Sequence, residues 1–157
     1  MNIRLSRHAR TRYAIDGAIY IDDQFICSCA ESIHTKLKAG TYAISITKCK
    51  QYGRKMPVLL LHPFNSPSST HCSPPCQSCH RQPYVSNNTN LPCYCPMIKS
   101  GNGVQNRDDG SIIVGKYLCS GALIHPVNTF QDLYERLRKS AERGHQLKIT
   151  INDNYGF

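Results

Sequence analysis

Five of the nine cysteines in this 157-residue chain fall within one short stretch, HCSPPCQSCHRQPYVSNNTNLPCYC, residues 71–95. Cys76 and Cys79 form a CxxC pair, and Cys93 and Cys95 form a CxC pair. Two closely spaced thiolate pairs are typical of small structural zinc sites, where four ligands surround the metal tetrahedrally. We therefore predict a structural zinc ion held by these four cysteines. The alternate ligands in the same stretch are Cys72, His71 and His80.

Two other interpretations of this stretch stay open: a disulfide framework, or free thiols in a loop. The odd total of nine cysteines does not allow complete pairing. The basic N-terminal segment lacks the apolar core of a secretory signal, so we expect a cytoplasmic protein, in which disulfides are disfavoured. A proline-rich stretch buries little apolar surface, and a bound metal would supply the missing folding energy.

The charge balance indicates an anionic partner. The formal net charge is +9, which suits peptidoglycan or another anionic polymer, and less directly nucleic acid. A solvated basic face is the alternative explanation. No run of 18 apolar residues is present, so we expect no membrane span. The basic residues gather in two places: Arg4, Arg7, Arg10 and Arg12, and Lys48, Lys50, Arg54 and Lys55.

Alternating apolar and polar residues predict a series of strands around these groups. In residues 17–31, two β-prone runs flank Asp22-Asp23, which predicts a tight hairpin. Cys27 and Cys29 then share one strand face and are expected to be buried. Further strands are predicted at the N-terminal NIRL and at residues 38–49, 56–63, 110–118 and 146–152.

One helix is predicted near the C-terminus, in HPVNTFQDLYERLRKSAERG. Asn128 or Thr129 is expected to cap its start and Gly144 to end it. One face should carry Phe130, Leu133, Tyr134, Leu137 and Ala141. We predict a single mainly β (α+β) domain over residues 1–157. It is a compact antiparallel β domain with one amphipathic helix, a final strand, and a Cys/Pro/Ser-rich insertion over residues 66–106.

Five segments follow in a distinctive order: AIDGAIYIDDQFICSCAES, LKAGTYAI, LLLHPFNS, DDGSIIVGKY and FQDLYERLRKSAERG. This order resembles a family of small bacterial and phage-encoded proteins of unknown function, which carries a His-Pro-Gly-Asn segment and a later Gly-Cys segment. The family's His and Cys are in turn similar to the motifs of L,D-transpeptidases, which cross-link peptidoglycan. The resemblance covers nearly the whole chain apart from the insertion.

The resemblance implies catalytic positions for three residues. His62 falls on the family histidine and Asn65 on its asparagine, with Phe64 replacing the glycine between them. Gly110 falls on the glycine before the cysteine, and Ser111 falls on the cysteine itself. A serine hydroxyl ionises far less readily than a thiol and needs a positioned base.

The serine favours a catalytically degenerate relative of the cell-wall-acting fold, which would serve as a binding or accessory module. One alternative is a zinc-stabilised module for nucleic acid or protein interaction. The other is an active Ser/Cys-His hydrolase or transferase on peptidoglycan peptides, in which either Ser111 is the nucleophile or a thiol of the insertion takes the place of the family cysteine. The candidates for that thiol are Cys72, Cys93 and Cys95.

Overall fold

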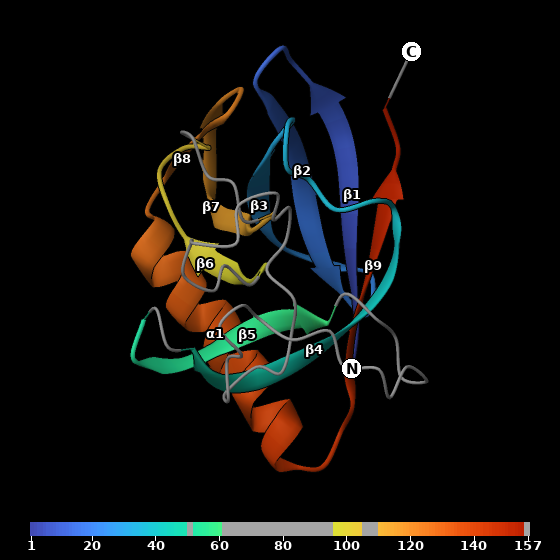
Figure 1. Cartoon of the computed structure of the whole chain (residues 1–157), viewed down its shortest axis with the longest axis vertical. Helices are drawn as coiled ribbons and strands as arrows, with labels where there is room; N and C mark the ends of the chain where they lie inside the picture. The colour runs from blue at the N-terminus through green and yellow to red at the C-terminus, as the bar shows by residue number, and fades with distance from the viewer. Residues whose placement is uncertain (50–51, 61–95, 105–109, 156–157) are drawn as a thin grey trace, which may run out of the picture.

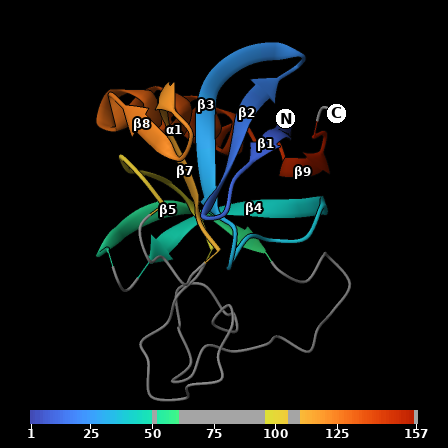
Figure 2. The same ribbon diagram turned by 90° about the horizontal axis from the view of Figure 1, so that it is seen from above.

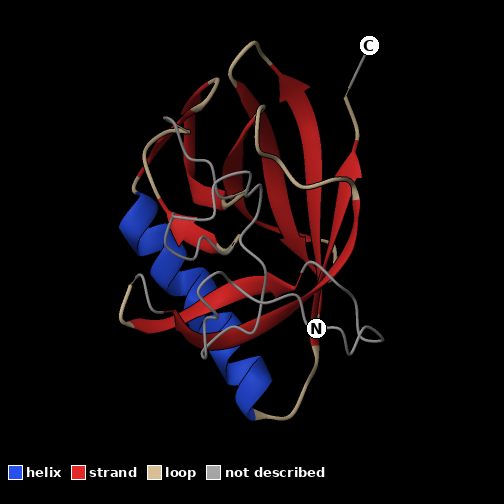
Figure 3. Cartoon of the chain, viewed as in Figure 1, coloured by secondary structure: helices blue, strands red, loops and turns tan. Residues whose placement is uncertain are grey.

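The computed structural model of the chain describes residues 1–49, 52–60, 96–104 and 110–155. Within these ranges the fold is mainly β with a single helix followed by a last strand, which confirms the predicted class (Figures 1 and 3). The elements are β1 Asn2–Arg10, β2 Ala14–Ile21, β3 Gln24–Ser32, β4 Gly40–Cys49, β5 Arg54–Leu60, β6 Ile98–Ser100, β7 Ile112–Cys119, β8 Ala122–Ile124, α1 Pro126–Glu142 and β9 Leu147–Asp153.

The strands form one curled sheet in the order β5-β4-β9-β1-β2-β3-β7-β6, and β8 pairs with β7. The two ends of this order meet again. Val58 of β5 forms a bridge with Met97, and the Leu59 N–H donates to the Pro96 carbonyl at 2.9 Å. The sheet is therefore a nearly closed barrel, and Figure 2 shows its strands around a common interior.

The sheet is not wholly antiparallel. β1 and β9 are parallel, and so are β6 and β7. β1 and β9 come from opposite ends of the chain, and α1 directly precedes β9. The sequence patterns predict the strands themselves but contain no signal for which strands become neighbours.

α1 covers one end of the barrel. Phe130, Leu133 and Leu137 are buried in the same core as the strand residues Leu5 and Ile149. The helix leads directly into β9, whose first residues pair with the start of β1, so α1 lies at the end of the barrel where the N-terminus is found (Figure 1). The predicted apolar face of the helix is confirmed, and its role is to seal this end of the core.

The predicted hairpin is also confirmed, as β2 and β3. Asp22 and Asp23 join the strands with φ values of 50° and 64°. Two successive left-handed residues match the twist of a two-residue hairpin, and Asp tolerates that conformation better than most residues. Cys27 and Cys29 follow on the inner face of β3, where both are buried.

The helix starts earlier than predicted. It begins at Pro126, after a left-handed His125 (φ 51°), rather than at a cap formed by Asn128 or Thr129. Proline suits the first helical position because its φ is already helical and it lacks an N–H that would have no partner there. The Thr129 hydroxyl instead donates to the His125 carbonyl at 2.8 Å, within the first turn. The predicted end is confirmed, since Gly144 follows the helix with φ 82°.

The bounds of the insertion expected over residues 66–106 stay a prediction. Residues 96–104 of that range are described, and they contain β6. Met97 and Ile98 are fully buried in the main core. Composition missed this strand because its apolar run is too short to show any periodicity.

Candidate functional site

Most of the predicted site residues lie outside the described residues. This holds for His62 and Asn65, and for every predicted zinc ligand and alternate: Cys76, Cys79, Cys93, Cys95, Cys72, His71 and His80. Within the part of the chain that the structure describes, no three His, Cys, Asp or Glu side chains are grouped to hold a metal ion. The zinc site and the pairing of His62 with Ser111 therefore stay predictions.

Ser111 is described, and it lies inside the sheet rather than in an open cleft. Its side chain is only 6% exposed. The Ser111 hydroxyl oxygen accepts a hydrogen bond from the backbone N–H of Met97 at 3.3 Å, directly before the β6–β7 ladder begins at Ile98 and Ile112. Ser111 thus helps to attach β6 to β7 at the place where the barrel closes.

We expect Ser111→Ala to lower the free energy of unfolding by about 1–3 kcal/mol, because the buried N–H of Met97 would lose this acceptor. Urea unfolding measures the change. Ser120→Ala is the matched control, since Ser120 lies exposed in the turn between β7 and β8, and it should change stability by less than about 0.5 kcal/mol. Equal effects of the two substitutions would contradict a structural role for Ser111.

Three cysteines in the described ranges are free thiols with different surroundings. Cys27 and Cys29 are buried, and Cys119 is exposed. Burial raises the pKa of the Cys27 thiol to about 12. Burial also raises the pKa of Cys29 well above its usual range, and the negative charge of Glu31 adds to the effect. Because the thiolate is the nucleophile, neither buried cysteine is suited to act as one.

Stability should fall at alkaline pH. The unfolded chain releases the Cys27 proton near the ordinary thiol pKa of about 8.5, whereas the folded chain keeps it until the pKa of about 12. The unfolded state therefore binds fewer protons across this window. Cys27 lowers the unfolding free energy there by up to about 1.4 kcal/mol per pH unit.

Urea unfolding between about pH 8 and pH 11 tests this slope. Other groups titrate in the same range, so the comparison is between variants. Cys27→Ala should show a shallower decline than the parent chain, whereas Cys119→Ala should keep the parental slope. An unchanged slope in Cys27→Ala would contradict the prediction.

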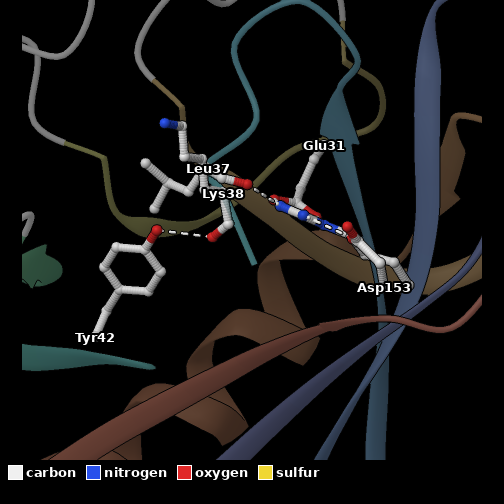
Figure 4. Close-up of polar contacts among 6 residues, drawn as sticks. Glu31, Leu37, Lys38, Tyr42 and Asp153 are labelled. Carbon is white, nitrogen blue, oxygen red and sulfur yellow. Dashed lines mark hydrogen bonds and ion pairs between the residues drawn. The ribbon is translucent and has the colours of Figure 1, made fainter. Parts of the chain in front are cut away.

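A buried ion cluster connects β1, β3 and β9 (Figure 4). Arg7 of β1 is completely buried and donates to both carboxylate oxygens of Glu31, at 2.8 and 2.7 Å. It also donates to Asp153 at 3.0 Å and to the Leu37 carbonyl at 2.7 Å. The cluster joins β1, β3, β9 and the connection between β3 and β4.

β2 packs closely against β1 and β3 at the register position of Arg7. Gly17 lies between Arg7 and Cys29 in the strand register. A Cβ atom at Gly17 would stand 2.9 Å from the Ser6 carbonyl oxygen and 3.1 Å from the Cys29 sulfur. The absence of a side chain at Gly17 therefore lets β1, β2 and β3 pack closely at this position.

We interpret the Arg7 cluster as a structural feature that holds β1, β3 and β9 together. Desolvation by burial would lower the pKa of Arg7, but the hydrogen bonds and charges of Glu31 and Asp153 outweigh it and raise this pKa above its ordinary value. The guanidinium therefore stays charged and makes four hydrogen bonds within the protein. Beside it, Tyr42 donates to the Lys38 carbonyl at 2.7 Å, which holds the covering connection in place (Figure 4).

A pocket of about 440 Å³ lies between β3, β7 and α1. It forms where two strands part, because β3 and β7 pair only over Ser28–Ala30 and 113–115. The first turns of α1 complete the pocket. Its walls are Phe25, Ile26, Cys27 and Ser28 from β3, Gly115, Lys116 and Tyr117 from β7, and Thr129, Asp132 and Arg136 from α1.

The rim of this pocket is aromatic and basic. Phe25 is 59% exposed and Tyr117 is 54% exposed. The Phe25 ring packs edge-to-face on Tyr20, with 5.9 Å between the ring centroids, and Arg4 lies 4.1 Å above the Tyr20 ring. Exposed aromatic rings held by their neighbours are typical of binding surfaces.

Comparisons of the chain with protein-family models, with curated proteins and with solved structures find no match. The sequence also contained no motif for the pocket. Its wall combines β3, β7 and α1, which are distant in the chain, so no spacing connects Phe25 with Tyr117 or Arg136. For Arg7 a signal existed, because it continues the alternation of Ile3 and Leu5 on the inner face of β1.

Proposed function

We propose that the chain is a non-catalytic binding module, a degenerate relative of the L,D-transpeptidase-like fold, whose ligand is peptidoglycan or a similar anionic polymer. The observation that carries the proposal is the environment of Ser111. Ser111 is only 6% exposed, and its oxygen accepts a backbone hydrogen bond within the sheet. In the resemblance on which the proposal builds, this serine falls on the family cysteine. A nucleophile needs access to substrate and a partner that accepts its proton.

The charge and the exposed aromatic rings support a binding role. The net charge of +9 favours an anionic ligand. Several exposed cations lie over aromatic rings, which keeps them oriented. Arg12 lies 5.8 Å from the Tyr13 ring centroid, and Arg54 lies 5.8 and 5.6 Å from those of Phe130 and Tyr134.

Cosedimentation with purified peptidoglycan sacculi tests the proposal. The protein should pellet with the sacculi, and the pelleted fraction should fall as salt rises, because the attraction is electrostatic. Incubation with soluble muropeptides should leave them unchanged. Turnover that Ser111→Ala abolishes would overturn the proposal and favour the active hydrolase or transferase.

A second candidate function is nucleic-acid binding, which the end of β1 favours. Arg10 lies 5.3 Å from the Tyr155 ring centroid, and the neighbouring Arg12 and Tyr13 are both exposed. Such pairs can stack on bases while the cations contact phosphates. An electrophoretic shift that disappears with salt would favour this function. If no shift occurs even at low salt, the candidate fails.

The predicted zinc ion belongs to this second function, in which it would stabilise the fold of the cysteine-rich stretch. Cys76, Cys79, Cys93 and Cys95 would hold the ion, and a closed four-thiolate site would act only on folding. Elemental analysis of the purified protein decides the question. We expect about one zinc ion per chain, and we expect it to be lost when Cys76 and Cys79 are both replaced by serine.

A further inference from the structure

The pocket between β3, β7 and α1 has the chemistry of a peptide site. We infer that it binds a short peptide that carries a free carboxylate. The assignment of this peptide as the stem peptide of peptidoglycan rests on the proposed function. The assignment of the pocket as a site for a peptide with a free carboxylate does not. The volume of about 440 Å³ is in the range of ordinary small-ligand sites.

Two cations are available for the carboxylate. Lys116 and Arg136 both line the pocket and are exposed. Neither makes an ion pair with any described residue, in contrast to Arg138 on the same helix, which pairs with Glu135 and Glu142. A guanidinium binds a carboxylate through two parallel hydrogen bonds, and an ammonium adds a further charge.

The start of β3 offers partners for the peptide backbone. Residues 24–27 pair with β2 on one side and with no described strand on the other, since the ladder with β7 stops at Ser28. An extended peptide can bind to such a free strand edge through main-chain hydrogen bonds.

The remaining walls suit the other parts of a peptide. The exposed rings of Phe25 and Tyr117 provide apolar surface for a side chain or a sugar ring. Asp132, from the same face of α1 as Arg136, places one carboxylate at the pocket that can accept hydrogen bonds from a ligand N–H. The pocket thus presents two cations for the free carboxylate of a peptide and one carboxylate for its N–H groups.

An NMR titration of the full chain with a soluble muropeptide tests the inference, and the same disaccharide without its peptide is the ligand control. The muropeptide should shift the backbone amide signals of Phe25, Ile26 and Tyr117, and the bare disaccharide should shift them much less. Absence of these shifts, or peptide-dependent shifts elsewhere on the protein, would overturn the inference.

A pair of double variants isolates the role of charge. Lys116→Gln/Arg136→Gln should weaken muropeptide binding by about tenfold or more. Lys55→Gln/Arg143→Gln removes the same charge at exposed positions that do not line the pocket, and it should bind nearly as the parent does. Equal affinity of the two variants would overturn the inference.

Sacculus binding separates this inference from the proposed function. If the parent chain fails to bind sacculi but binds the muropeptide in the pocket, the proposed function fails and the pocket assignment stands. If the parent and the pocket variant bind sacculi equally, and the pocket signals do not shift, the pocket assignment fails and the proposed function stands.

Discussion

Replacing Glu31 by alanine is expected to lower the free energy of unfolding by about 3–5 kcal/mol, because it leaves a buried guanidinium without its main partner. Arg7 is completely buried, and Glu31 receives two of its hydrogen bonds, at 2.8 and 2.7 Å. The other carboxylate in contact, Asp153, has a side chain that is 40% exposed and can compensate only in part. Chemical denaturation at neutral pH measures the loss.

Two variants serve as controls for this prediction. Glu135→Ala removes a carboxylate from the solvent-exposed pair with Arg138 and should leave stability close to that of the parent. Arg7→Met/Glu31→Leu replaces the buried pair with apolar side chains and should recover much of the loss, since such replacements are often neutral. If Glu31→Ala lowered the free energy of unfolding as little as Glu135→Ala, the cluster would not hold the strands together as we describe.

Replacing Leu137 by alanine is expected to cost about 2–5 kcal/mol of unfolding free energy, because it opens a cavity where α1 seals the barrel. Leu137 is fully buried in the main core. Alanine is at least as good a helix former as leucine, so the loss would come from packing and not from helix propensity. Thermal or urea unfolding measures it.

Leu118→Ala is the matched control, because Leu118 of β7 is 57% exposed. The same change of side chain should there alter stability by less than about 0.5 kcal/mol. A Leu137→Ala variant with parental stability would show that α1 does not seal the core. The contrast between the two leucines therefore tests the position of the helix directly.

No helix among the described residues is long and apolar enough to cross a membrane.

The strand and helix predictions succeeded where a periodic pattern extended over several residues, as in the β2–β3 hairpin and the apolar face of α1. The predictions failed where the apolar run was short, or where the same residues are typical of two different local structures. β6 has only three residues, and Asn128 and Thr129 look like helix caps although Pro126 already begins the helix.

The candidate site was predictable only in part. The resemblance singled out Ser111, and the structure adds that its oxygen accepts the Met97 N–H. The charge clusters included Arg7, but a local count of cations cannot distinguish a buried guanidinium from an exposed one. Its burial depends on Glu31 and Asp153, which other strands bring to it.

The sequence by itself determined the longer strands, the hairpin turn and the amphipathic helix, because these depend on residues close together in the chain. It also determined the net charge and the cysteine-rich stretch. Only the tertiary structure decided that β1 lies beside β9, that β5 meets the segment of Met97, and that Phe25, Tyr117 and Arg136 share one pocket. Those contacts arise from closing the sheet around a common core, and local sequence carries little information about which distant segments will meet there.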